Sequence, residues 1–174
     1  MLETLIKRKS IRSYTGEGIS EEELKIILKA ADASPVGMKK YETLHLTIIT
    51  DKEVLNKIES SEGKMFARDD MHPLYGSPML ILISSKLVMP GMENVMYSNA
   101  AIMSHNISLA ATSLNIGSCY IWGATAAISK DEEVLKLLDL PEGFIPCCGV
   151  CLGKTLEQFE DKEIPERISK TFIK

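Results

Sequence analysis

The sequence predicts an α+β fold in which a single β-sheet lies between two layers of helices. Four short runs of apolar and β-branched residues have the character of strands, and longer segments between them carry apolar residues at helical spacing. Helices and strands do not alternate strictly, so we expect a mixed sheet rather than a purely parallel one. A chain of 174 residues without repeats or linkers fits one domain, residues 1–174.

Capping residues and apolar periodicity locate the helices. The clearest start is at Ser20, where Glu23 completes a capping box ahead of apolar residues at helical spacing. The longest pattern covers 95–114 and predicts a central, largely buried helix. Helices are expected over residues 2–8, 20–33, 51–60, 95–114 and 130–138, with a loop or irregular helix over 61–77.

Strands are expected over residues 44–50, 79–84, 118–122 and 144–152, and the second of these is apolar on both faces. The tail that follows, residues 154–174, is charged and carries only scattered apolar residues. Ile164, Ile168 and Phe172 recur at four-residue intervals. The tail is therefore either a frayed terminus or an apolar stripe that packs on a neighbouring surface, such as another subunit.

Composition and charge exclude several classes of protein. The chain is 45% hydrophobic and 25% charged, which is typical of a soluble globular domain. Its net charge of −4 gives no electrostatic footprint for nucleic acid. No apolar stretch reaches membrane-spanning length, and charges at residues 7–12 occupy the place where a signal peptide is hydrophobic. We expect a cytoplasmic protein with no nucleic-acid or membrane partner.

The cysteines allow two interpretations. Cys148 and Cys151 have the spacing of half a metal site or of a redox pair. No second pair with metal-ligand spacing accompanies them, the histidines are scattered, and the run 144–152 predicts a buried strand. Burial of the four cysteines as small hydrophobic residues is the favoured interpretation, and no metal site is expected.

A short basic run, residues 7–12, ends the first expected helix of this acidic chain. Arg8, Ser10 and Arg12 alternate, so in an extended segment their side chains emerge on one side. Two guanidinium groups and a hydroxyl suit a phosphate. The alternative is that these cations complement the helix dipole and stay solvated.

Four segments occur in an order and spacing that resemble the nitroreductase family of FMN-dependent oxidoreductases. These segments are residues 8–12, 31–35, 74–78 and 114–123, and a strand end at 150–154 follows them. Together they cover nearly the whole chain. The resemblance favours the phosphate interpretation of the basic run.

The resemblance also implies an architecture and a cofactor. It implies a three-layer sandwich with a mixed, mainly antiparallel sheet, and a homodimer that binds FMN at the subunit interface. The tail from about residue 154 to 174 is then expected to pack on the partner subunit. Neither chain would make a whole site by itself.

Site residues follow from position within the family pattern. Arg8 and Arg12 match residues on the FMN phosphate, and Ser10 one at the ribityl chain or pyrimidine edge. Gly123 matches a strand end whose main-chain N–H faces flavin N5, and Trp122 either stacks near the cofactor or is a core aromatic. The cofactor-binding set is Arg8, Lys9, Ser10, Arg12, Pro35, Val36, Gly37, Met38, Tyr120, Ile121, Trp122 and Gly123, with Lys154 and Lys162 as rivals for a further phosphate contact.

Residues on the substrate side are also implied. Lys39 and Lys40 stand where many members have an amide-rich pocket edge, so they either favour an anionic substrate or reduced flavin, or are solvated loop lysines. Asp69 and His72 lie in a loop that resembles a segment at the flavin edge.

The implied function is transfer of hydride from NAD(P)H through flavin N5 to a nitroaromatic, a quinone or a similar small acceptor, by a ping-pong mechanism. The flavin carries this chemistry, so no protein catalytic residue is required. The alternative is a flavin-binding or sensing protein without efficient turnover. Residues 85–96 favour it, because they form only a connector where longer members carry inserted helices over the site.

Overall fold

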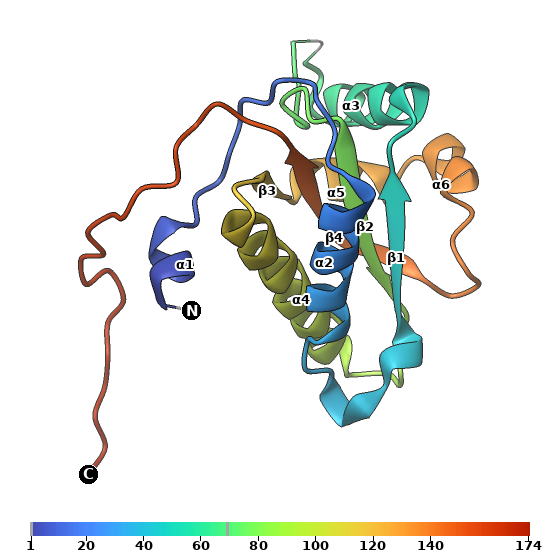
Figure 1. Ribbon diagram of the computed structural model, residues 1–174. Helices are drawn as coiled ribbons and strands as arrows, with labels where there is room; N and C mark the ends of the chain where they lie inside the picture. The colour runs from blue at the N-terminus through green and yellow to red at the C-terminus, as the bar shows by residue number, and fades with distance from the viewer. Residues whose placement is uncertain (1, 69) are drawn as a thin grey trace.

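The computed structural model describes residues 2–68 and 70–174, and it is built on one four-stranded sheet with the order β1-β2-β4-β3 (Figure 1). The strands are β1 (Leu44–Ile49), β2 (Met79–Ser85), β3 (Gly117–Ile121) and β4 (Ile145–Gly153). The expected α+β sandwich is confirmed. The three described strand pairings are all antiparallel, whereas a mixed sheet was expected. β2 starts at the end of the sheet where β1 finishes.

Helices cover both faces of this sheet (Figure 1). One face carries α2 and α4, with α1 packed on α4, and the other carries α3, α5 and α6. The helices are α1 (Leu2–Lys7), α2 (Glu21–Asp32), α3 (Lys52–Phe66), α4 (Glu93–Ser113), α5 (Gly123–Ile128) and α6 (Glu132–Leu138). Alternate residues of β2 divide between the two cores, with Ile81 and Ile83 on the α2/α4 side and Leu80 and Leu82 on the other.

Two helices differ from the sequence-based expectation. The helix expected over 51–60, with a loop or irregular helix after it, is longer than expected, because α3 continues as a regular helix to Phe66 and ends at a left-handed Ala67. Its last turns bury polar and small residues, including Glu62 and Gly63, so apolar periodicity does not show them. Helix α5 is not predicted at all, since its small residues carry no capping signal. It forms where the chain leaves β3 and packs on α3.

The two chain ends lie away from the sheet, on the same side of the molecule (Figure 1). The described tail after β4 contains no helix or strand. Several of its apolar side chains are exposed in the single chain, among them Ile168 and Phe172, each about four-fifths exposed. Within the described residues, no helix combines the length and the apolar character needed to cross a membrane.

A close crossing fixes where the N-terminal segment meets the sheet. Gly117 of β3 and Gly153 of β4 are paired opposite one another, and Ile11 and Tyr14 pack directly on them. A Cβ on Gly153 would lie 2.6 Å from Cδ of Pro78 and 3.1 Å from Cδ1 of Tyr14. The crossing therefore requires glycine at these strand ends.

Replacing Gly153 by alanine tests this crossing. Overpacking against the rigid Pro78 ring is expected to lower the free energy of unfolding by about 1–3 kcal/mol. The measurement is urea denaturation, with Gly18→Ala as the matched control. A Cβ on Gly18 meets nothing within 4 Å, so that variant should unfold like the parent. Equal midpoints for all three proteins would contradict the packing constraint.

Candidate functional site

The segment after α1 presents its polar side chains on one side, as the alternation in the sequence predicts. The Ile11 N–H donates to the Ser118 carbonyl of β3 at 2.9 Å, and the Ile11 side chain is completely buried. Its neighbours Ser10 and Arg12 are exposed. Anchoring one residue to the sheet thus fixes the direction of the two beside it.

Arg8, Ser10 and Arg12 gather around one buried thiol, that of Cys119. Burial raises the pKa of Cys119, and Arg12, the Ser10 hydroxyl and Arg8 offset part of that rise. Arg12 also lies over the ring of Tyr75, 5.7 Å from its centroid, a cation–π contact that orients the guanidinium. The three predicted residues therefore share one site.

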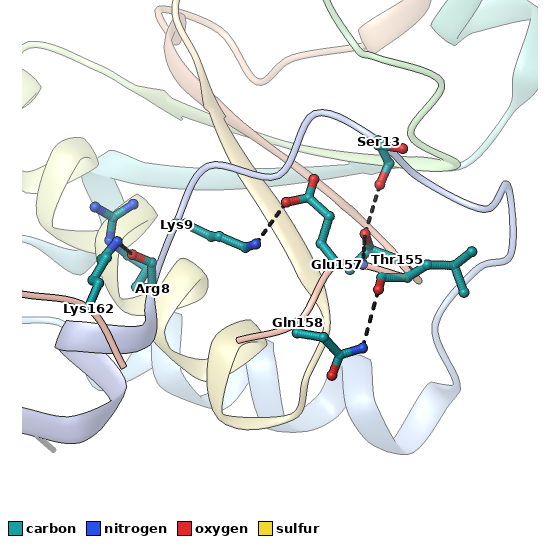
Figure 2. Close-up of polar contacts among 8 residues, drawn as sticks. Arg8, Lys9, Ser13, Thr155, Glu157, Gln158 and Lys162 are labelled. Carbon is teal, nitrogen blue, oxygen red and sulfur yellow. Dashed lines mark hydrogen bonds and ion pairs between the residues drawn. The ribbon is translucent and has the colours of Figure 1, made fainter. Parts of the chain in front are cut away.

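The tail returns to this segment and adds further positive charge (Figure 2). Lys162 Nζ donates to the backbone carbonyl of Arg8. Desolvation lowers the pKa of Lys162, and the charges of Arg8, Lys9 and Arg167 lower it further. Lys9 is paired with Glu157, at 2.8 Å. We call Arg8, Lys9, Lys162 and Arg167 the basic cluster.

Lys154, the other lysine expected near the phosphate, has a different partner. Its Nζ contacts Glu23 Oε1 at 2.5 Å, and this contact lowers the pKa of Glu23. Its backbone N–H donates to the Glu17 carbonyl. Lys154 is thus held at the start of α2, whereas Lys162 is held at Arg8.

The loop from Pro35 to Lys40 contains strained backbone. Met38 and Lys39 both have φ 56°, in the left-handed region that side chains with a Cβ rarely adopt. The loop is held on α4, because the Gly37 N–H donates to Asn99 Oδ1 at 3.0 Å. Such strain, when its surroundings hold it in place, is concentrated at functional sites.

Side chains of this loop divide by exposure. Val36 is buried, whereas Pro35, Met38, Lys39 and Lys40 are exposed. Within the described residues, the ion pair of Lys40 is with Glu42, at 3.5 Å.

The substrate-side residues of the following loop are placed elsewhere. His72 is exposed, and its Nδ1 lies 3.5 Å from Glu59 Oε2 on α3. Asp69 lies outside the described residues. The structure therefore brings His72 to α3, while Lys39 and Lys40 belong to the loop before β1.

The end of β3 has an exposed aromatic side. Tyr120 and Trp122 are exposed, Trp122 by 63%, while Ile121 between them is buried. Trp122 is therefore not a core aromatic in this chain. It is the residue before α5, and Gly123 is the first residue of that helix.

Sequence reasoning misses Glu62, a buried acid next to this strand end. A Cβ on Gly123 would overlap Oε1 of Glu62, so the carboxyl group lies directly against Gly123. The spacing Leu55, Ile58, Glu62 places the acid on the buried face of α3 and is the signal that could have found it.

Burial of the four cysteines is confirmed. Cys148 packs in the core beneath α4, and Cys151 packs in the core on the other face of the sheet. Residues three apart on a strand point to opposite faces. The Cys148–Cys151 spacing is thus not a redox pair in this fold.

Comparison with known proteins identifies the family and the fold. The model of the nitroreductase family matches residues 5–154, and the chain belongs to that family. A nitroreductase from Bacteroides fragilis with bound FMN is 28% identical, with a TM-score of 0.81 over 99% of this chain and 98% of that one. One from Desulfitobacterium hafniense with bound FMN is 24% identical, with a TM-score of 0.85 over 99% and 97%, and shows the same fold.

Among curated proteins, the FMN reductase (NADPH) of Bacillus subtilis is 26% identical over 164 residues. The match covers 87% of this chain and 64% of the relative.

The residues present fit a phosphorylated ligand such as FMN. Four cations of the basic cluster approach one another, and among the described residues the carboxylate paired with them is Glu157. Gathering like charges is unfavourable unless an anion joins them. A phosphate group, which guanidinium and ammonium groups bind well, supplies that anion.

The reactivity of the cysteines tests whether they are buried in the folded protein. Burial raises the pKa of Cys147 to about 11 and that of Cys148 to about 12, so fewer than about one in a thousand of these thiols is ionised near pH 8. Titration with a chromogenic disulfide should detect almost no rapid reaction in the native protein and four thiols after denaturation. Rapid reaction of two native thiols would contradict this arrangement.

Proposed function

We propose that this chain is an FMN-dependent oxidoreductase that takes hydride from NAD(P)H and passes it to a small acceptor. The observation that carries the proposal is the basic cluster, brought together from both ends of the chain beside β3 in a protein of the nitroreductase family. The relatives support it, since the Bacteroides fragilis structure contains FMN and the Bacillus subtilis protein is named an NADPH-dependent FMN reductase.

In this proposal the basic cluster and its neighbours hold the phosphate. Arg8 and Arg12 supply guanidinium groups, Ser10 supplies a hydroxyl, and Lys162 adds a further charge. Ser10 and Arg12 are oriented by the buried Ile11 between them, so little side-chain order has to be created on binding.

The strand end from Tyr120 to Gly123 faces the ring system of the cofactor in this proposal. Bound FMN would accept and donate hydride, and the protein's task is to orient it and leave one side open to substrates. A main-chain N–H at Gly123 stabilises negative charge that develops beside it. No side-chain acid, base or nucleophile is assigned.

The acting unit is proposed to be a homodimer. The exposed apolar residues of the tail, with Ile164, Ile168 and Phe172 among them, have no cover within the described part of one chain. A partner subunit that packs against residues 154–174 removes this surface from water. The same partner then brings its own loop 35–38 to the cofactor, so each site uses both chains.

NAD(P)H and the acceptor are proposed to use one cavity in turn, which gives ping-pong kinetics. The proposed acceptors are nitroaromatics, quinones and similar small molecules. Lys39 is exposed on a strained, anchored loop, and an ammonium group there attracts anionic acceptors or stabilises reduced flavin.

A flavin-binding protein without efficient turnover is the second candidate. The observation that favours it is the connector between β2 and α4, residues 86–92, which contains no helix or strand to cover the site. An open site excludes water poorly and holds substrates less firmly.

Colour, reduction and size test the proposal together. The purified protein, supplied with FMN, should be yellow and dimeric by light scattering. Anaerobic NADH or NADPH should bleach the flavin absorbance band, and an added quinone or nitroaromatic should restore it. A yellow protein that neither nucleotide reduces favours the second candidate, and a colourless monomer that ignores FMN refutes both.

The two tail lysines provide a matched pair of variants. Lys162→Ala should weaken FMN binding about tenfold or more, because it removes a cation beside Arg8 that is partly desolvated. Lys154→Ala removes a cation that is already paired with Glu23, and should leave FMN affinity within about twofold. Quenching of flavin fluorescence gives both dissociation constants. If Lys154→Ala weakened FMN binding more than Lys162→Ala, the phosphate contact would be assigned to Lys154 instead.

A further inference from the structure

Glu62 is a buried acid for which the proposed function has no use. Its side chain is only 5% exposed, and among residues 2–68 and 70–174 its Oε2 is buried without a hydrogen-bond partner. It follows Ile58 by one helical turn on the face of α3 that packs on α5. An unpaired buried carboxyl group is costly, so its retention at this position calls for a physical explanation.

The carboxyl group lies where the chain turns from β3 into α5. A Cβ on Gly123 would overlap Glu62 Oε1 and approach Cδ to 3.1 Å, so only glycine leaves room for the acid. Trp122, the preceding residue, is exposed and has helical backbone angles. The Glu62 carboxyl group therefore lies directly against the turn that carries Trp122.

The charges around Glu62 come from few elements. Burial raises the pKa of Glu62, and the negative charge of Glu59 on the same helix raises it further. Glu59 in turn contacts His72 and accepts from the Leu74 N–H. Helix α5 contributes no titratable side chain, since its residues are glycine, alanine, threonine and isoleucine. At the start of α6, Asp131 caps its own helix and has Lys64 nearby.

We propose that Glu62 is a positioning residue for Trp122 and Gly123. It packs under Gly123 as a neutral acid, and loss of its proton displaces the turn between β3 and α5. The consequence for FMN rests on the proposed function, in which this turn faces the cofactor: ionisation of Glu62 then weakens FMN binding. The neutral acid keeps the turn in its binding position.

The protein contains its own probe for the first step. Trp122 is the only tryptophan in the sequence, so fluorescence excited at the long-wavelength edge of tryptophan absorption, where tyrosine does not absorb, reports on this turn. In the full-length chain before flavin is added, emission should shift as the pH rises, with a midpoint above the ordinary value for glutamate. Glu62→Gln should abolish the shift. The control Glu53→Gln, exposed on the same helix, should retain it.

A second variant tests the same group without altering it. Glu59→Gln removes the negative charge that disfavours ionisation of Glu62, so the fluorescence midpoint should move to lower pH. The Glu59→Gln variant tests the role of Glu62 even if Glu62→Gln does not fold. A midpoint that is absent in the parent, that persists in Glu62→Gln, or that does not move in Glu59→Gln overturns the proposal.

The FMN dissociation constant, measured by flavin fluorescence, tests the second step. In the parent it should rise with pH through the same midpoint, by about tenfold for each unit by which FMN raises the Glu62 pKa. Glu62→Gln should keep the low-pH affinity throughout. A fluorescence transition that depends on Glu62, in a chain that binds no FMN at any pH, leaves the positioning role intact and refutes the proposed function. FMN affinity independent of pH overturns the link between them.

Discussion

The crossing of the N-terminal segment over the paired glycines of β3 and β4 is the constraint on which the site depends. Ile11 fills the space that a side chain at Gly117 would occupy, and its N–H completes a backbone hydrogen bond to Ser118. A few residues later, the Thr15 N–H donates to the carbonyl of Lys154 at the end of β4. These contacts fix the backbone of residues 11–15 at both ends, and with it the positions from which Arg12 and its neighbours project.

The same crossing explains why the two ends of the chain meet. β4 finishes at Gly153, beside Tyr14 and Thr15 at the far end of the segment that follows α1, so the tail begins where that segment leaves the sheet. From there it runs back along the segment, with contacts from Thr155 to Ser13, from Glu157 to Lys9 and from Lys162 to Arg8 (Figure 2). Cations separated by over 150 residues in sequence are thereby gathered in one place.

Sequence reasoning recovers the parts of this protein that depend on local signals. The capping box at Ser20, the fully apolar β2 and the alternation of Ser10 and Arg12 around Ile11 each follow from a short pattern. What it misses depends on tertiary contacts. Helix α5 forms from small residues because α3 packs on it, and the last turns of α3 are buried although they read as polar. Glu62 lies in those last turns of α3 and packs against Gly123 of α5, so the helical spacing can indicate its burial but not this contact.

The basic cluster is held mainly by the tail, and in the proposed function this links cofactor binding to order at the chain ends. Lys162 and Arg167 lie in a segment without helix or strand, and α1 buries none of its residues. Neither end gains much from the core, so repulsion among the cations acts against the contact between them. An anion that bridges the cluster reverses the sign of that interaction and stabilises the bound state in proportion to the logarithm of its concentration. Phosphate binding and docking of the tail are then one coupled equilibrium, in which each favours the other.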